Sequence, residues 1–290
     1  MRLDDEPEST NFEVQDGRGG GMGGGLGGGL GLLLPLIGSR FGCGGIVVVL
    51  IVLAVMGVNP LSLMSGGGQM PQSGEVSRDA SKLNDIQHWS LKVLGSTERV
   101  WGPAFQQAGQ QYQPTVLSFY SQSGSSGCGA AQSAMGPFYC PNDKKVYLDT
   151  DFFTELRQRF GAPGDFAQAY VIAHEVGHHV QDLEGTLGQV NQQQRAVSEE
   201  EGNALQVRVE LQADCYAGVW AKRTGLMEAG DLEEGMKAAQ AIGDDTLQKA
   251  AGRRPVPESF THGTSEQRMN WLRKGLDSGD PAQCDTFKGA

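Results

Sequence analysis

The sequence predicts a mostly helical α+β domain with a small β-sheet, preceded by a single transmembrane helix. Three features of the 290-residue chain lead to this fold class: stretches with apolar residues at helical spacing, two short runs with strand character, and one uncharged apolar run near the N-terminus. The strand signals lie at 137–140 and 145–149, just before the helix predicted at 165–183. The predicted helices are roughly 81–108, 151–160, 165–183, 192–223, 232–242, 244–251 and 265–276.

The N-terminal part of the chain differs in composition from the rest. Residues 1–41 are acidic and then glycine-rich, with little apolar surface to bury, so we predict that they are disordered. Residues 42–58 carry no charge, and a run of this length is close to the minimum for crossing a bilayer. We predict a transmembrane helix there, a linker over 59–79 and a folded domain over 80–290. A buried core element and a cleaved signal peptide are the alternatives for the apolar run.

Basic residues on the two sides of the apolar run set its expected orientation. Arg18 and Arg40 precede the run, and the first basic residue after it is Arg78, which favours a cytoplasmic N-terminus. We therefore expect a single-pass protein of the cytoplasmic (inner) membrane, with its C-terminal domain in the periplasm or outside the cell.

The charge balance excludes one class of partner. The chain has 23 basic and 34 acidic side chains and a formal net charge of −11, and its basic residues are not clustered. A nucleic-acid binder needs positive charge to displace counterions from phosphates. We therefore expect no nucleic-acid partner.

Four cysteines of the predicted domain suit two disulfides, as in exported proteins. Cys128 and Cys140 bracket a short glycine-containing loop, so their pairing is the economical one, and it leaves Cys215 with Cys284. Four cysteines allow three connectivities, and four free thiols in a cytosolic domain are the alternative. No Cys-x-x-Cys pair is present, so the spacing does not suggest a metal site.

A short motif on the helix predicted at 165–183 carries the chemistry. His174 and His178 are four residues apart, so both rings project from one face of the helix, one turn apart. Both rings can then bind one Zn²⁺, and Glu175 can reach a metal-bound water without taking a coordination position. His-Glu-x-x-His is typical of zinc peptidases, in which the glutamate is the general base. Two solvated surface histidines are the alternative, which the apolar flanking residues disfavour.

A catalytic zinc needs a third protein ligand. Glu184 falls where metzincins place a third histidine, but Gln181 occupies the position at which their chain turns on a glycine. Glu210 and Asp214 are four apart on the next predicted helix. We predict that Glu210 completes the site and that Asp214 accepts a hydrogen bond from the outer ring nitrogen of a ligand histidine. A pair of surface acids is the alternative.

These residues carry a resemblance to known enzymes. The segments 174–178 and 210–214 resemble the gluzincin pattern His-Glu-x-x-His followed by Glu-x-x-x-Asp. The stretch from about 80 to 287 is similar to the bacterial neutral zinc metallopeptidase family, on motifs at 138–141, 146–149, 213–218 and 261–268. The resemblance implies a zincin-like fold, one Zn²⁺ per chain and a peptide or protein substrate. It also implies an upstream edge strand that pairs with the substrate, for which 135–139 is the candidate.

A second resemblance concerns the segment that contains His262 and Arg268. It is similar to the Thr-His-Pro-x-x-x-x-Arg segment of prenyl-protein membrane peptidases, although Gly263 stands in place of the proline. The resemblance implies that His262, and with less support Arg268, stabilises a developing oxyanion. A helix start capped by Thr264 or Ser265 is the plainer interpretation, and both can hold.

Two functions of different classes fit these residues. The first is a zinc-dependent endopeptidase in which His174, His178 and Glu210 bind Zn²⁺ and Glu175 takes the proton from water. The second is a membrane-tethered, non-catalytic zinc-containing module that binds peptides. The glutamate at position 175 favours the enzyme, because a binding module has no need of a base there.

Overall fold

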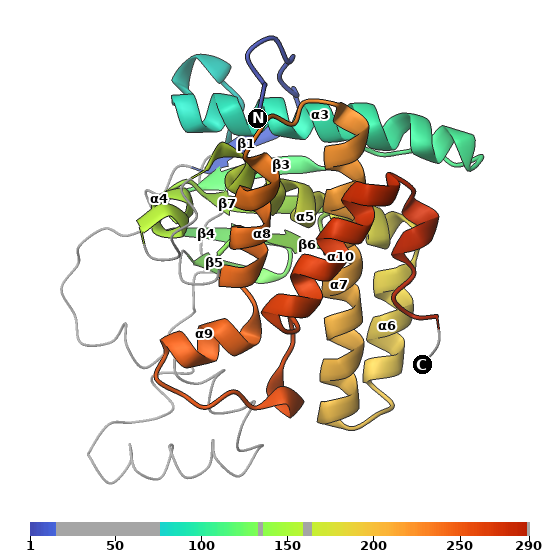
Figure 1. The fold of residues 1–290 in the computed structure, drawn as a ribbon. Helices are drawn as coiled ribbons and strands as arrows, with labels where there is room; N and C mark the ends of the chain where they lie inside the picture. Colours follow the sequence, from blue (N-terminus) through green and yellow to red (C-terminus); the bar gives the residue numbers. More distant parts are fainter. Residues whose placement is uncertain (16–75, 133–135, 159–163, 289–290) are drawn as a thin grey trace, which may run out of the picture. The chain divides into compact units, whose positions relative to one another are not determined.

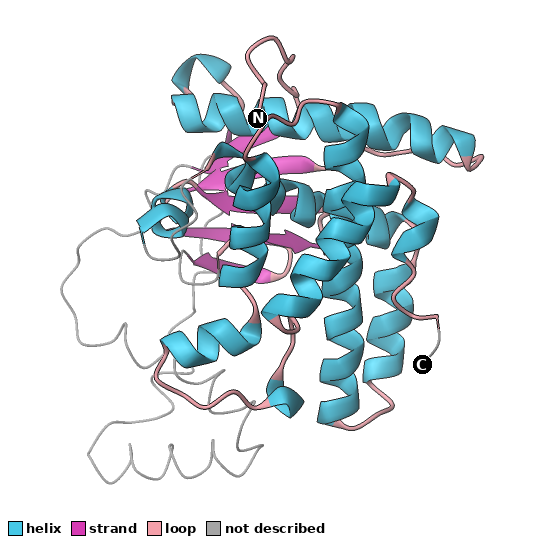
Figure 2. Ribbon diagram, in the orientation of Figure 1, coloured by secondary structure: helices cyan, strands magenta, loops and turns pink. Residues whose placement is uncertain are grey.

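The computed structural model describes residues 1–15, 76–132, 136–158 and 164–288, which all belong to one of the two units into which the chain divides. These residues form a mostly helical α+β fold with a small sheet (Figure 2). The strands are β1 (Phe12–Gln15), β2 (Val76–Ser77), β3 (Val116–Tyr120), β4 (Ser123–Ser126), β5 (Gly129–Gln132), β6 (Phe138–Cys140) and β7 (Lys145–Asp149). The α-helices are α3 (Asp85–Gln107), α4 (Asp151–Gln158), α5 (Asp165–Leu183), α6 (Thr186–Gln194), α7 (Glu199–Thr224), α8 (Asp231–Ala241), α9 (Asp244–Ala250) and α10 (Ser265–Ser278).

The main sheet has five strands in the order β2-β1-β3-β7-β6. Strands β1, β3 and β7 are parallel, whereas β6 runs antiparallel to β7 and forms one edge of the sheet. β4 and β5 form a separate two-stranded sheet. The edge strand β6 lies beside α5, which brings the end of the sheet next to the helix that carries the histidine motif.

Helix α7 packs against both α5 and α10 (Figure 1). At the crossing with α10, a Cβ atom on Gly218 or Gly275 would overlap the facing backbone. At the crossing with α5, a Cβ on Gly177 would lie 3.1 Å from the Cα of Ala213. Small residues at these crossings let the three helix backbones approach closely, so polar side chains on neighbouring turns of different helices can meet.

Helix boundaries follow local capping chemistry. The expected helix at 192–223 is in fact two helices, α6 and α7, and a capping box between Ser198 and Glu201 starts the second. Thr264 caps α10 with Gln267 in the same way, as the plainer interpretation of this segment predicted. These caps fix where α7 and α10 begin, and hence which residues of the two helices face α5.

The first residues of the chain differ from the expectation of disorder over 1–41. Leu3 and Phe12 are buried in the main core, and β1 pairs with both β2 and β3. The amino group of Met1 donates hydrogen bonds to Asp165 at 2.9 and 2.8 Å and to Asp231 at 3.1 Å. The few apolar residues of this segment thus find partners in the distant part of the chain.

The expected transmembrane helix requires a correction. The segment 42–58 lies outside the described residues, and no helix among the described ones is both long and apolar enough to cross a membrane. The sheet gives a physical reason: β1 pairs in parallel with β3, with Phe12 opposite Leu117 and Val14 opposite Phe119. A chain that crossed a bilayer once between residues 15 and 76 would place these strands on opposite sides. The single-pass fold class and the inner-membrane location with a periplasmic domain are therefore not supported.

Candidate metal centre

Three side chains from α5 and α7 converge on one point. The Nε2 atom of His174 lies 3.2 Å from Oε2 of Glu210, and the Nε2 atom of His178 lies 3.6 Å from the same oxygen. The two imidazole rings stand nearly perpendicular, at 85°, with their centroids 4.7 Å apart. Among the described residues, His174, His178 and Glu210 form a group whose ligand atoms all lie within 4.8 Å of one another.

This donor set fits a zinc ion. Tetrahedral ligands at 2.0–2.2 Å from a metal lie about 3.3–3.6 Å from one another. The two distances to the Glu210 oxygen, 3.2 and 3.6 Å, are close to this range. Two imidazole nitrogens and one carboxylate oxygen are a ligand set found in catalytic zinc sites, which keep the fourth position open. The arrangement predicted from the sequence for His174, His178 and Glu210 is thus geometrically possible in this fold.

The outer ring nitrogen of His174 is held by a buried polar cluster. Its Nδ1 atom lies 2.9 Å from Oδ1 of Asp214, which also accepts a hydrogen bond of 2.6 Å from the Tyr170 hydroxyl. Arg268 donates to both carboxylate oxygens of Asp214, each at 2.9 Å. Asp214 and Arg268 are 0% and 2% exposed, so this pair is fully withdrawn from water. It fixes the ring of His174 with Nε2 facing Glu210.

The same geometry changes the interpretation of Arg268. Its guanidinium donates hydrogen bonds to Asp214, to the Tyr170 hydroxyl at 3.3 Å and to the carbonyl of Ile242 at 3.3 Å. The Asp214 carboxylate raises the pKa of Arg268 further above its usual range, against the effect of burial. Arg268 also lines the cleft, but its guanidinium makes these contacts beside His174, so the structure shows it as a support for Asp214.

Charges within the centre are strongly coupled. Burial lowers the pKa of His174, but Asp214 and Glu210 outweigh it and raise the value to about 9. Burial raises the pKa of Glu210, yet His178 and His174 hold it well below its usual range. The His174 ring thus holds a positive charge between the carboxylates of Asp214 and Glu210. A metal ion bound at Nε2 of His174 would replace the proton on that nitrogen.

Glu175, His174 and His178 all line one cleft in the protein surface, and Glu175 is 7% exposed. Burial raises the pKa of its carboxyl, and the neighbouring histidines offset this only in part. A carboxylate with a raised pKa is a better proton acceptor near neutral pH than an exposed one. Its position and basicity both suit a general base.

The cleft has a volume of about 1050 Å³ and is walled by different parts of the fold. One wall is β6 with the turn before it, and it includes Phe138 and Tyr139. Other lining residues come from the end of α8 and from α9, and they include Leu247 and Ala250. His174, His178 and Glu210 line the same cleft, so the candidate metal ligands are open to a molecule that enters it.

His262 lines the cleft from the loop before α10, half exposed. Its Nδ1 atom lies 3.3 Å from Oδ1 of Asp244, and the other oxygen of Asp244 accepts hydrogen bonds from the backbone N–H groups of Thr261, His262 and Gly263. Gly263 has a φ of +87°, which the turn requires. The hydrogen bond that the His262 ring donates to Asp244 raises the pKa of His262. This cradle aims the free side of the ring into the cleft.

Glu184, the alternative third ligand, lies apart from this group. Its Oε2 atom accepts a hydrogen bond of 2.8 Å from the Tyr216 hydroxyl. The structure therefore brings Glu210 and not Glu184 to the two histidines.

Several residues of the site were not identified from the sequence. Tyr170 lies one turn before His174, a spacing that could have indicated it, whereas Asp244 is 18 residues from its partner His262 and carries no local signal. Gln206 donates to Oε1 of Glu210 at 3.0 Å, again one turn earlier on the same helix.

Two disulfides join parts of the fold around the site. Cys128 pairs with Cys140, and Cys215 pairs with Cys284, which is the connectivity that the spacing favoured. The first joins the β4–β5 hairpin region to β6, and the second joins α7 to the C-terminal 3-10 helix Pro281–Cys284. Each therefore fixes an element that contributes to the cleft or to the metal centre.

Comparisons with known proteins agree with this geometry. The family model described as "Putative neutral zinc metallopeptidase" matches residues 1–287. The chain is 47% identical over 294 residues to "Uncharacterized protein YpfJ" of Escherichia coli (strain K12), which covers 99% of each chain. It is 43% identical over 209 residues to "Uncharacterized protein Rv2575" of Mycobacterium tuberculosis, which covers 67% of this chain and 68% of that one. No solved structure shows significant similarity to it. The chain therefore belongs to the family described as "Putative neutral zinc metallopeptidase".

Proposed function

We propose that this protein is a zinc-dependent endopeptidase that hydrolyses peptide bonds of protein substrates. The observation that carries the proposal is the convergence of His174 Nε2 and His178 Nε2 on one oxygen of Glu210, with Glu175 beside them in an open cleft. Membership of the family supports the same chemistry. His174, His178 and Glu210 would hold one Zn²⁺ per chain.

A zinc ion at this point supplies Lewis acidity and activates water at neutral pH. Glu175 accepts a proton from the attacking water and returns it to the leaving amine. Its burial supports this role, because a carboxyl with a raised pKa is a stronger base than an exposed one and holds the proton it has taken until the leaving amine accepts it. Asp214 and Arg268 keep the His174 ring in position while the charge in front of it changes.

His262 is proposed as the donor to the developing oxyanion. With Nδ1 facing Asp244, its Nε2 atom carries a proton when the ring is charged, and Asp244 raises the pKa of the ring in favour of that form. A charged donor aimed at the oxygen that becomes negative lowers the barrier more than it stabilises the bound substrate. Arg268 is not assigned to this role.

The substrate is proposed to bind as an extended segment along β6. This strand ends the order of the described sheet, so one of its edges has no strand partner among the described residues. Phe138 and Tyr139 of β6 line the cleft, within the region 135–139 expected from the sequence, of which Met135 lies outside the described residues. Backbone pairing to such an edge does not depend on the substrate's side chains, and it suits a substrate that is already unfolded.

The proposal is tested by comparing wild-type protein with Glu175→Gln, using unfolded casein as substrate and measuring bound zinc in the same samples. We expect the variant to retain zinc and to lose cleavage by about 100-fold or more, as for loss of a general base. Glu184→Gln is the matched control, because it neutralises a carboxyl at the end of the same helix but outside the centre.

The same experiment separates the enzyme from a non-catalytic zinc-containing module that binds peptides. For such a module, wild type and Glu175→Gln would bind casein equally and cleave none of it. Equal cleavage by both proteins would instead remove Glu175 from its role as base.

A further inference from the structure

The outer nitrogen of the second histidine has an unusual partner. His178 Nδ1 lies 2.9 Å from Oε1 of Gln181, an uncharged side chain, whereas the corresponding nitrogen of His174 faces the carboxylate of Asp214. Gln181 is 0% exposed. The ring of His178 is therefore oriented by a buried amide, which does not by itself determine which ring nitrogen carries the proton.

The neighbours of Gln181 determine which ring nitrogen of His178 carries the proton. Its Nε2 atom donates to the carbonyl of Val209 at 2.7 Å and to Oε1 of Gln212 at 2.9 Å. The Val209 carbonyl can only accept, so the amide nitrogen of Gln181 must face α7 and its oxygen must face His178. An oxygen there accepts a hydrogen bond and cannot donate one, so Nδ1 of His178 carries the hydrogen. Its Nε2 lone pair then points to Glu210.

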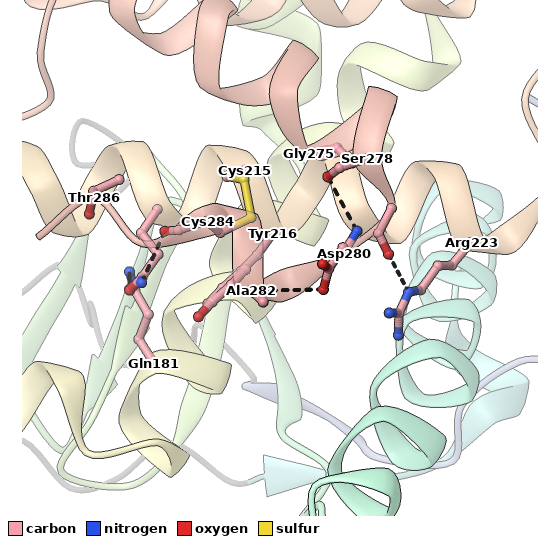
Figure 3. Close-up of a disulfide and its surroundings, with 12 residues drawn as sticks. Gln181, Cys215, Tyr216, Arg223, Gly275, Ser278, Asp280, Ala282, Cys284 and Thr286 are labelled. Carbon is pink, nitrogen blue, oxygen red and sulfur yellow. Dashed lines mark hydrogen bonds between the residues drawn. A yellow bond between two sulfur atoms is a disulfide. The ribbon is translucent and has the colours of Figure 1, made fainter. Parts of the chain in front are cut away.

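A second buried glutamine extends this chain of hydrogen bonds to the C-terminal disulfide. Gln212 donates through Nε2 to the carbonyl of Cys284 at 3.2 Å, which turns its own oxygen toward Gln181. Cys284 is held in place by its disulfide to Cys215 on α7 (Figure 3). The Cys284 carbonyl fixes the orientation of the Gln212 amide, and the Gln212 oxygen in turn favours the same orientation of the Gln181 amide. This series of hydrogen bonds ends at the proton on Nδ1 of His178.

We propose that Gln181 and Gln212 are positioning residues that fix the tautomer of His178 for metal binding, and that the Cys215–Cys284 disulfide anchors the outer end of their hydrogen-bond chain. This inference rests on the zinc site proposed above. It adds to that site a second set of supporting side chains, separate from the Asp214–Arg268 pair, that contains no charged group.

The first test uses metal-free protein and nitrogen NMR of the histidine rings at alkaline pH. Wild-type protein should show His178 with its proton on Nδ1. Gln181→Leu, which has similar size and no hydrogen-bonding group, should shift the ring toward a mixture of both tautomers. A purely structural role for Gln181 would change stability without moving this signal.

The second test measures the zinc dissociation constant by competition with a chelating dye. Gln181→Leu should weaken zinc binding by about 10–100-fold, the range for partners of metal-bound histidines. Gln212→Leu and the double variant Cys215→Ala/Cys284→Ala should weaken it in the same direction by less. Thr286→Val is the matched control: it removes a 2.7 Å hydrogen bond from the C-terminal segment to the Arg208 carbonyl of α7, outside the chain, and should bind zinc as wild type does.

Either of two results for Gln181→Leu overturns the proposal: an unchanged His178 tautomer or an unchanged zinc affinity. If this variant does not fold, the same two measurements on Gln181→Met decide, because methionine is of similar size and its thioether cannot donate to the Val209 carbonyl that orients the native amide. Equal zinc affinity of the disulfide variant and wild type would overturn the anchoring role of Cys284. A wild-type chain that binds no zinc would remove the proposed function, whereas the tautomer measurement needs no metal and would still assign Gln181.

Discussion

The buried pair of Arg268 and Asp214 gives a sharp prediction about stability. Arg268→Met keeps most of the apolar stem of the side chain and removes the guanidinium. It deletes two hydrogen bonds of 2.9 Å to Asp214 and bonds of 3.3 Å to Tyr170 and to the Ile242 carbonyl. The carboxylate of Asp214 remains 0% exposed, and its remaining hydrogen-bond partners are the Tyr170 hydroxyl and the His174 ring.

The size of the effect follows from this loss. Hydrogen bonds to charged groups contribute about 1.5–3 kcal/mol each, so the two bonds to Asp214 account for about 3–6 kcal/mol. Removing one partner of a buried ion pair typically costs about 3–5 kcal/mol, because the other charge stays buried. We therefore expect Arg268→Met to lower the free energy of unfolding by about 4 kcal/mol.

Urea denaturation of the full chain with a zinc chelator present measures this effect without any contribution from metal. The matched control is Lys237→Met, which breaks an ion pair of 2.7 Å with Glu233 on the surface of α8. Exposed pairs of this kind contribute about 0–1 kcal/mol, so the control should stay close to wild type. A loss below 1 kcal/mol for Arg268→Met, or equal losses for both variants, would refute the role assigned to the buried pair.

Three further predictions follow from the same contacts. Metal content should fall most in Glu210→Ala, to an intermediate level in Asp214→Ala and hardly at all in Glu184→Ala; an empty site in Glu184→Ala with zinc retained in Glu210→Ala would reverse the ligand assignment. Against the effect of burial, Arg268 and His174 lower the pKa of Asp214 from 3.8 to about 2. Its contribution to stability, about 2 kcal/mol, is therefore present above about pH 4 and lost as the pH falls toward 2. Acid unfolding of wild type and Asp214→Asn measures this loss, and equal slopes in that range would contradict it. Gly275→Ala should lower the melting temperature, because its Cβ would overlap the backbone of Cys215, whereas Gly102→Ala meets no atom within 4 Å and should not lower it.

The sequence predicted the parts of the fold that depend on local pattern. Apolar spacing located α5, and the short strand signal at Lys145–Asp149 located β7. It did not locate β1, because the four residues Phe12–Gln15 are a strand only through pairing with β3, about a hundred residues away in the chain. The predicted single membrane crossing rested on the local composition of residues 42–58, which lie outside the described residues, and no described helix is long and apolar enough to cross a membrane.

The candidate site divides in the same way. His174 and His178 are one helical turn apart and Glu175 follows His174 directly, so the geometry of the three follows from their spacing alone. Glu210 was inferred from its spacing to Asp214, and the structure places both beside the histidines. The pairing of Arg268 with Asp214 spans 54 residues, and it depends on the close crossing of α7 and α10 at two glycines. No local pattern contains that information.

The central claim is that His174, His178 and Glu210 hold one zinc ion, and zinc-edge X-ray absorption on the full chain tests it most directly. The claim predicts one zinc per chain with nitrogen and oxygen ligands only, at about 2.0–2.2 Å, and with the scattering signature of two imidazoles. The signal should lose one imidazole or disappear in His178→Ala. A sulfur ligand at about 2.3 Å, or an unchanged spectrum in His178→Ala, would contradict it.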